Sequence, residues 1–302
     1  MIFSILITTY NRLNELKITL QSLEDFYIRN DVEFIICVDG STDGTYTFLK
    51  ENYPKIKLIN HSKSKGLIAS RNELLSLTKA KYAISLDDDA NFLSDNVLES
   101  IEALFEKHPK CGLQAFSIYW DLEKPKNTLK HEKVERVKGF VGCGHVWNME
   151  AWNSIPNYSV WFVFYGEEDF AAFQLFKKDW HIYYNPQVLV HHRVNIKQRS
   201  TQNDYATRLR RSLRSGWYLY FLFYPVKLIP RRVLYTLWIQ LKTRVFKGNL
   251  KAALAIIKAI FDVLLNIHKL IKNSNRLSSK EFQEFSKLPS TKIYWKPNNS
   301  NS

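Results

Sequence analysis

The chain has 302 residues, a formal net charge of +14 and three cysteines, Cys37, Cys111 and Cys143. Three widely spaced cysteines without a CxxC pair exclude a disulfide framework and a cysteine-rich zinc module, and they favour a reducing compartment. Because no stretch offers about 18 uncharged apolar residues and the N-terminus lacks a basic leader, we expect neither a membrane-spanning helix nor a secretory signal.

The first 90 residues alternate between apolar runs and segments with helical periodicity. The expected strands are FSILITTY (3–10), EFIICVDG (33–40), IKLINH (56–61) and YAISLDDDA (82–90). The expected helices are RLNELKITLQSLEDF (12–26), TDGTYTFLKEN (42–52) with Thr42 or Asp43 as its cap, and GLIASRNELLSLT (66–78). Near-continuous apolar strands that alternate with helices predict an α/β fold with a mostly parallel sheet and helices on both faces.

Polar residues gather where each of these four strands ends. The clusters are Thr8–Arg12, Asp39–Asp43, His61–Lys65 and Asp87–Asp89. Ligands of open α/β sheets bind beyond the carboxyl ends of the strands, so we expect a binding site along this edge.

The following hundred residues continue the pattern of strands and helices. We expect a helix from Leu98 to about Lys107, a strand at 111–120 and a surface loop or short hairpin at 121–137. Residues 139–155 should form a strand, a glycine-rich turn and the start of a helix. A further helix begins in GEEDF (166–170), and a strand that Pro186 breaks follows at 181–194.

The composition changes near the end of that strand. Residues 1–190 hold 21 Lys and Arg against 25 Asp and Glu, whereas residues 191–302 hold 22 against 4. Such a basic part indicates contact with phosphate on nucleic acid, on a nucleotide or on anionic lipid.

The last expected helix carries its polar residues on one narrow stripe and is otherwise apolar. The stripe consists of Arg244, Lys247, Lys251, Lys258, Asp262, Asn266 and Lys269. Two interpretations of the apolar face remain open. It packs on the body or on a sister helix, or it lies in a membrane interface with its lysines toward lipid phosphate.

Three adjacent carboxylates, Asp87, Asp88 and Asp89, close the fourth strand. In an extended chain Asp87 and Asp89 point to the same side, where they can share one hard cation such as Mg²⁺ or Mn²⁺, whereas Asp88 points the other way, toward a helix terminus or a backbone donor. A lone carboxylate at a strand end is most often a turn former, but three in a row favour a neutralising partner.

Several motifs in order along the chain resemble the inverting nucleotide-sugar glycosyltransferases of family 2, which share the GT-A fold. The motifs are TTYNR (8–12), VDGSTDGT (38–45), GLIASRNEL (66–74), LDDDA (86–90), GCGHVWNMEAW (142–152), GEEDF (166–170) and VHHR (190–193). Each pattern alone is weak, and their shared order and strand-end positions make the resemblance specific. It covers the first two thirds of the chain and does not extend to the basic part.

On the donor side, the resemblance implies a pocket for a nucleotide diphosphate sugar. Its residues would be Thr8, Tyr10, Arg12, Asp39, Arg71, Asp87 and Asp88. Tyr10 would lie near the base, Asp39 would accept a hydrogen bond from a uracil-type ring, and Arg71 would lie near the base or the phosphates. Asp87 and Asp89 match the DxD motif that binds Mn²⁺ or Mg²⁺, with His191 or His192 as a further ligand, of which strand alternation allows only one to reach the site.

On the acceptor side, GEEDF matches the acidic motif that supplies the general base. The resemblance implies Asp169 in that role, with Glu168 as the alternative because the alignment is ambiguous by one residue. A carboxylate at a helix start is also the commonest N-cap, so only one of the acidic residues needs to be catalytic.

We therefore expect a GT-A domain over 1–192, with its nucleotide-sugar half at 1–110 and its acceptor half at 111–192. A basic, aromatic helical region at 193–292 would contact an anionic membrane at the inner face of the plasma membrane, and 293–302 would be disordered. The expected reaction joins a sugar from a UDP- or dTDP-sugar to a glycan or lipid-linked acceptor. The alternatives are a nucleotidyltransferase, which the glycine-free segment 8–17 disfavours, and a nucleic-acid-binding protein, which the aliphatic helix face disfavours.

Overall fold

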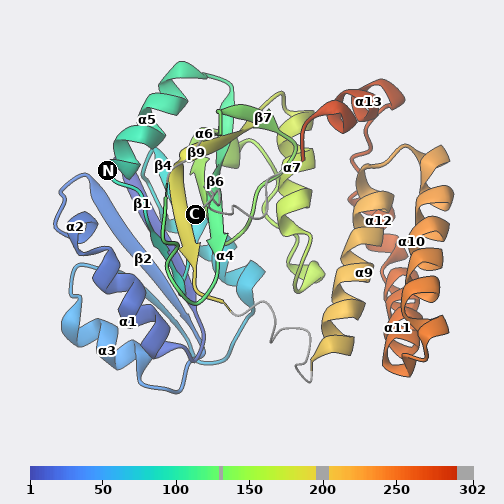
Figure 1. Cartoon of the computed structure of the whole chain (residues 1–302), viewed down its shortest axis with the longest axis horizontal. Coiled ribbons are helices and arrows are strands. Elements are labelled where there is room, and N and C mark those ends of the chain that lie inside the picture. The colour runs from blue at the N-terminus through green and yellow to red at the C-terminus, as the bar shows by residue number, and fades with distance from the viewer. Residues whose placement is uncertain (129–131, 195–203, 291–302) are drawn as a thin grey trace.

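The structure is a computed structural model that describes residues 1–128, 132–194 and 204–290. Two parts lie side by side (Figure 1): a body that contains the described strands, and a group of C-terminal helices. The tail at 293–302, predicted to be disordered, lies outside the described residues.

The described strands form one mixed sheet with the order β3-β2-β1-β4-β8-β6-β9-β5, and β7 pairs with β9. The strands are β1 (Phe3–Thr9), β2 (Val32–Asp39), β3 (Lys57–His61), β4 (Tyr82–Asp87), β5 (Ala90–Phe92), β6 (Cys111–Trp120), β7 (Glu135–Val137), β8 (Gly144–Asn148) and β9 (His181–His192). Strands β1, β2, β3 and β4 pair with one another in parallel. Strand β8 pairs antiparallel with β4 and β6, and β5 and β7 pair antiparallel with β9. The α/β class is confirmed, and the parallel part is limited to the first 90 residues and the pair β6–β9.

Helices cover both faces of the sheet and form the C-terminal part (Figure 1). Those of the body are α1 (Leu13–Ser22), α2 (Glu24–Tyr27), α3 (Thr45–Asn52), α4 (Leu67–Leu77), α5 (Val97–Lys107), α6 (Met149–Asn153) and α7 (Glu167–Lys177). The C-terminal ones are α9 (Tyr205–Phe223), α10 (Ile229–Thr243), α11 (Leu250–Leu265), α12 (Ile267–Lys272) and α13 (Ser279–Lys287), with 3-10 turns η1 (Val160–Phe162), η2 (Val226–Leu228) and η3 (Val245–Lys247). Within the described ranges, none of the helices combines the length and the apolar run needed to cross a bilayer.

Strand alternation creates two apolar cores. On β1, Phe3, Ile5 and Ile7 pack with α1, α3 and α5, whereas Leu6 faces the core of α4, α6 and α7. Burial on both faces explains why these strands are apolar almost throughout. The parallel register also brings the polar strand ends together, since Thr8 lies opposite Asp87.

Two local predictions are refined by the structure. The cap of α3 is Gly44, with φ at 85°, rather than Thr42 or Asp43. The Asp43 carboxylate instead accepts hydrogen bonds from the backbone N–H groups of Leu13 and Thr45, so it joins two helix starts. Pro186 interrupts the pairing of β9 with β6 but does not end the strand. The residues between Asn185 and Leu189 have no partner on β6, and pairing resumes at Leu189.

The C-terminal helices share a core with the body. α9 packs between α7 and the outer helices α10 and α11, with Phe173 stacked on Phe223 at 4.8 Å between ring centroids. The predicted last helix is interrupted at Gly248, whose φ is 84°, and at Asn266. α11 therefore packs on its sister helix, as one of the two interpretations proposed, while its other face stays exposed.

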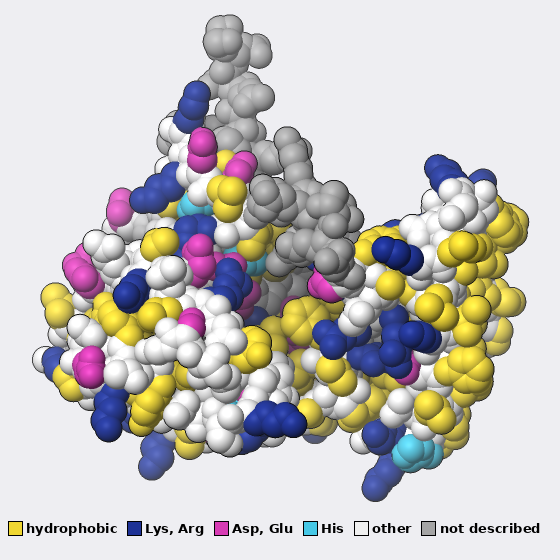
Figure 2. All heavy atoms as spheres, turned by 90° about the horizontal axis from the view of Figure 1, so that it is seen from below, with side chains coloured by type: hydrophobic (Ala, Val, Ile, Leu, Met, Phe, Trp, Pro, Cys, Tyr) yellow, Lys and Arg dark blue, Asp and Glu magenta, His cyan; other side chains and the backbone are white. Residues whose placement is uncertain are grey.

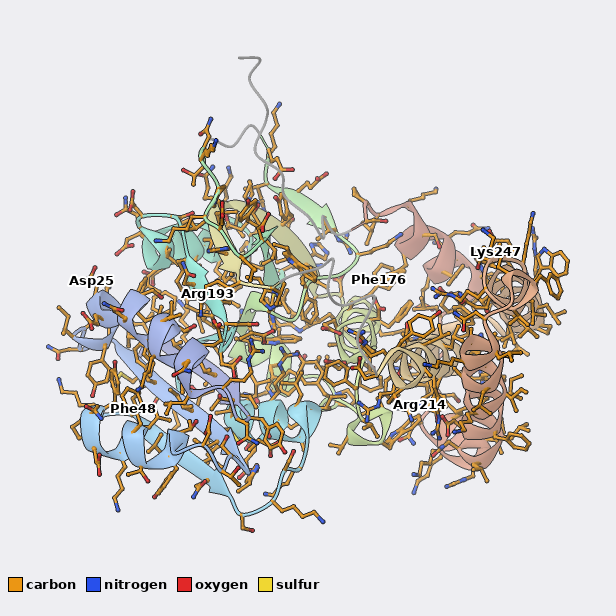
Figure 3. All side chains as sticks on the ribbon, turned by 60° about the horizontal axis from the view of Figure 1, so that its bottom comes forward. Asp25, Phe48, Phe176, Arg193, Arg214 and Lys247 are labelled. Carbon is orange, nitrogen blue, oxygen red and sulfur yellow. The ribbon has the colours of Figure 1, made fainter. Side chains whose placement is uncertain are left out.

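The polar stripe is not uniformly exposed. Asp262 is buried on α11 and pairs with Arg210 and Arg214 of α9, both basic residues of the C-terminal part (Arg214 is labelled in Figure 3). Alanines at 252, 255 and 259 complete this buried face. The small side chains let α11 approach α9 closely, and the ion pair fixes the register between them.

Candidate active site

The three aspartates at the end of β4 divide as strand alternation predicts. Asp87, Asp89 and His192 place ligand atoms within 4.8 Å of one another, and Asp88 is not part of this group. We call these three residues the aspartate–histidine group. His192 Nε2 lies 3.0 Å from Asp89 Oδ1 and 3.9 Å from Asp87 Oδ2.

The pairing of β5 with β9 brings His192 to the aspartates, since Ala90 lies opposite His192. The next residue, Arg193, lies against α1 (Figure 3), and its guanidinium donates to Thr19 at 2.8 Å and to Asn91 at 2.7 Å. His191 points to the other face, where its Nε2 lies 2.9 Å from the carbonyl oxygen of Asp121. Of the two predicted histidines, His192 alone lies with the aspartates.

Basic side chains pair with the aspartates in the protein itself. Arg12 donates to Asp89 at 2.6 Å and lies 3.4 Å from Asp88. Burial alone would raise the pKa of Asp89, but His192 and Arg12 outweigh it and lower that pKa to about 2. For Asp88 burial prevails over Arg12 and raises the pKa to about 7.

The aspartate–histidine group fits a divalent cation. Two carboxylates and one imidazole are donors that Mn²⁺ accepts, and carboxylates with substrate phosphates suit Mg²⁺. Asp89 Oδ1 faces His192 Nε2 at 3.0 Å, so two of the atoms that would bind a cation already lie side by side. A second set, Cys37, Asp39 and His61, has similar spacing. Burial raises the pKa of Cys37 to about 11, which disfavours the thiolate that a metal needs.

Arg71 connects the aspartates at the end of β4 to the acidic start of α7. It is buried on α4, and its guanidinium lies 2.8 Å from Asp87 and 3.4 Å from Glu167, and donates to the Gly142 carbonyl at 2.9 Å. A Cβ at Gly142 would lie 2.9 Å from the Arg71 guanidinium and 2.4 Å from the Glu168 carboxylate, so any larger residue would displace these two groups. Arg71 therefore lies beside the carboxylates at the end of β4.

Asp39 has a different environment from the one the resemblance implies. Its buried carboxylate receives hydrogen bonds from Ser64 and from the backbone N–H groups of Lys65 and Gly66, and His61 Nδ1 lies 2.7 Å away. These contacts occupy about four acceptor sites, the usual capacity of a carboxylate. Asp39 thus holds the loop after β3 in place, and contact with a base would need one of these donors to turn away.

Thr8 and Tyr10 lie at the end of β1. The Thr8 hydroxyl is buried without a hydrogen-bond partner among the described residues and lines a water-sized pocket with Arg71 and Asp87. Tyr10 is 53% exposed, as a side chain that stacks on a ligand needs to be. Both residues therefore lie along the edge where the predicted nucleotide pocket belongs.

The acidic motif starts α7. Glu167 is buried against Arg71, Glu168 is half-buried, and Asp169 is exposed to the interior of a cleft. Burial and the charge of Glu167 raise the pKa of Glu168 to about 8, and the same two causes raise the pKa of Asp169. The Asp169 side chain is accessible to solvent within the cleft, but the surrounding protein removes part of the hydration of its carboxylate, and this raises its pKa.

The cleft beside α7 has a volume of about 730 Å³. The connection from β7 to β8, α7, α9, α10 and α13 form its walls, so the C-terminal helices complete it. Sequence reasoning missed two of its lining residues, Lys138 and Arg232. Neither falls in a motif, and only the packing of α10 and of the loop after β7 brings them near Asp169.

The model of glycosyl transferase family 2 matches residues 4–181, more than half of the chain. The chain belongs to glycosyltransferase family 2. The chain is similar to WfaP of Escherichia coli, which is named UDP-Glc:alpha-D-GlcNAc-diphosphoundecaprenol beta-1,3-glucosyltransferase. The two sequences are 31% identical over 99 residues. The match covers 32% of this chain and 39% of that relative, so it spans well under half of the relative's length.

Solved glycosyltransferases share the fold of this family 2 chain. One is GalNAc-T7 with UDP, GalNAc and Mn²⁺, at a TM-score of 0.56 and 14% identity, over 73% of this chain and 50% of that one. Another is mannosyltransferase PcManGT of Pyrobaculum calidifontis with GDP-Man and Mn²⁺, at a TM-score of 0.55 and 15% identity, over 94% and 83%. These neighbours confirm the GT-A fold.

Proposed function

We propose that this chain is an inverting, metal-assisted glycosyltransferase that moves a sugar from a nucleotide diphosphate to an acceptor hydroxyl. The buried guanidinium of Arg71 carries the proposal, because it connects Asp87 to Glu167 at the start of α7. In a displacement at the anomeric carbon, leaving group and nucleophile must meet in one place. Arg71 thereby holds Asp87, on the side of the leaving group, next to the start of α7, the helix that carries Glu168 and Asp169.

The aspartate–histidine group would hold Mn²⁺ or Mg²⁺, and the cation would neutralise the diphosphate as it leaves. Arg12, whose side chain is 42% exposed, is the chain's own cation beside Asp88 and Asp89 and is placed to bind a phosphate oxygen. Asp169 would accept the proton of the acceptor hydroxyl, with Glu168 as the alternative base. Attack from the cleft opposite the leaving diphosphate inverts the anomeric carbon.

For the donor we propose a UDP- or dTDP-sugar. The WfaP relative is named for a UDP-glucose donor, and the PcManGT neighbour is described with GDP-Man. The four contacts at Asp39 give no direct support for a uracil-type base, so the base needs a direct test.

A thermal-shift panel of UDP, dTDP, GDP and ADP, each with and without Mn²⁺, tests the donor and the metal together. We expect UDP or dTDP to raise the Tm only when Mn²⁺ is present, because the cation offsets the repulsion between phosphate and the acidic group. A shift of equal size in EDTA would contradict the metal assignment. A preference for GDP would contradict the base assignment while leaving glycosyl transfer intact.

We further propose that the chain acts at the inner face of the plasma membrane on a glycan or lipid-linked acceptor. An outer apolar surface supports this. Its side chains are each at least half exposed, and they are Leu234, Tyr235, Trp238, Phe246, Leu250, Leu254, Ile257, Phe261, Leu264 and Leu265. Figure 2 shows such side chains gathered along the outer edge of the C-terminal helices.

Exposed cations accompany the outer apolar surface. They are Arg231, Lys242, Lys247, Lys251 and Lys258. An aliphatic face with flanking lysines and arginines suits the interface of an anionic bilayer, whereas nucleic acid offers no apolar surface of this kind. The WfaP relative is named for an acceptor that carries a diphosphoundecaprenol, which agrees with a membrane location for this chain.

The triple variant Trp238→Ser, Ile257→Ser, Phe261→Ser tests this location. We expect it to bind vesicles of phosphatidylglycerol at least about a hundredfold more weakly in co-sedimentation, because each large side chain contributes about 1.5–3 kcal/mol when fully buried. The matched control replaces Ile18, Ile28 and Leu77, which are exposed on the body, and should bind as the unaltered chain does. Oligonucleotide binding without vesicle binding would instead favour a nucleic-acid partner.

A further inference from the structure

Two cations in the cleft have no assigned role in sugar transfer. Lys138 follows β7, and Arg232 lies in the first turns of α10, so they reach the cleft from separate parts of the chain. Among the described residues, neither side chain forms an ion pair within 4.0 Å, and the charge of Lys138 acts on Asp169 only enough to offset part of the rise of that pKa. Unpaired cations that line a cavity are available to an anionic ligand.

The walls near these cations are aromatic. Tyr220 and Tyr224 have ring centroids 4.7 Å apart, and Phe282 continues the row at 4.6 Å from Tyr224. All three line the cleft together with Asp169. Such a wall suits a sugar face or a hydrocarbon chain, while the cations suit a charged group on the same molecule.

An anionic acceptor needs these cations for an electrostatic reason. Asp169 lines the same cleft, and in the ionised form that a general base requires, its carboxylate repels a phosphate on an incoming acceptor. A neutral glycan is not repelled by this carboxylate, and it carries no negative charge that the two cations could bind. Lys138 and Arg232 therefore favour an acceptor that carries phosphate close to its reactive hydroxyl.

The position of Arg232 relates this subsite to the membrane. Leu234, the first residue of the outer apolar surface, lies two positions after Arg232 on α10. One helix thus contributes to the cleft and to the surface expected to contact lipid. A phosphate-linked lipid can place its chain at that surface and its head group in the cleft.

We propose that Lys138 and Arg232 bind the phosphate of a phosphate-linked amphiphilic acceptor and position its hydroxyl at Asp169. This inference rests on the proposed glycosyl transfer and specifies the acceptor. The cations bind and position only, and they take no part in bond making.

Binding of n-octyl phosphate below its micelle concentration, followed by calorimetry in EDTA, tests the subsite. Lys138→Gln and Arg232→Gln should each weaken binding about tenfold, the loss expected for one hydrogen bond to a charged group. Lys280→Gln is the matched control, since Lys280 is exposed on α13 but lies outside the cleft lining, and it should change binding less than about twofold. Neutral n-octyl β-glucoside should bind all four proteins alike.

The remaining outcomes separate the sources of phosphate and the two proposals. Inorganic phosphate that binds as tightly as octyl phosphate would overturn the amphiphilic part, since the aromatic wall would then contribute nothing. Equal weakening of octyl phosphate and octyl glucoside would overturn the charge-specific role. The thermal shifts with UDP, dTDP, GDP and ADP in Mn²⁺ are measured on the unaltered chain and on the same variants. If none of the four nucleotides shifts the Tm of the unaltered chain, glycosyl transfer is refuted separately from the subsite.

Discussion

Asp89→Asn is expected to lower kcat by at least about a thousandfold while the protein stays folded. The amide keeps the shape of the carboxylate but removes the charge that the cation requires. Asp89 is almost fully buried, 1% exposed, and its carboxylate interacts with both Arg12 and His192. Asparagine is therefore preferable to alanine, which would leave both cations without a partner at this position.

The measurement is sugar transfer with saturating donor and Mn²⁺, with circular dichroism and Tm as checks on folding. Asp95→Asn is the control, because Asp95 is exposed before α5 and outside the aspartate–histidine group. Unchanged activity of Asp89→Asn, or full activity in EDTA, would refute the metal site. A loss that Asp95→Asn shares would point to a general effect of charge.

Asp169→Asn is expected to lower kcat by about 10² to 10⁴ and to leave the KM for the donor nearly unchanged. Asparagine cannot accept the proton of the acceptor hydroxyl, but it keeps the hydrogen-bonding outline of the cleft wall. Glu168→Gln is the matched comparison, since both residues line the cleft. We expect a smaller loss there, and the reverse order would assign the base to Glu168.

The pH dependence separates the two carboxylates further. A general base acts only in its ionised form, so the rate falls as the pH drops through the pKa of the base. Burial and Glu167 raise the pKa of Glu168 to about 8, so an acid limb near that pH that disappears in Glu168→Gln would identify Glu168. An acid limb that persists in Glu168→Gln and disappears in Asp169→Asn supports the proposed base.

Most of the body could be predicted from local patterns. Apolar runs such as those of β1 and β2 are unambiguous because both of their faces are buried, and helical leucine spacing marks α1. The antiparallel members of the sheet could not be predicted, since pairing partners far apart in sequence depend on how the elements pack. The end of the last helix was missed for a similar reason, because Asn266 gives little local signal for a break.

For the site, the sequence identified the residue types and the structure identified their neighbours. Alternation alone predicts that Asp87 and Asp89 face one side, and the structure agrees. The choice between His191 and His192 needed the pairing of β5 with β9. The donors around Asp39 come from the end of β3 and the loop that follows it, and only the folded position of that loop shows that they surround this carboxylate.

By itself, the amino-acid sequence determined the α/β class, the strand-end position of the carboxylates and the division into a near-neutral body and a basic C-terminal part. These properties follow from side-chain periodicity and composition, which are local. Only the tertiary structure decided that Arg71 connects Asp87 to Glu167, and that α9, α10 and α13 complete the cleft with Arg232. Arg71 and Glu167 are 96 positions apart in the sequence, and the walls of the cleft also come from distant segments, so only long-range packing brings them together.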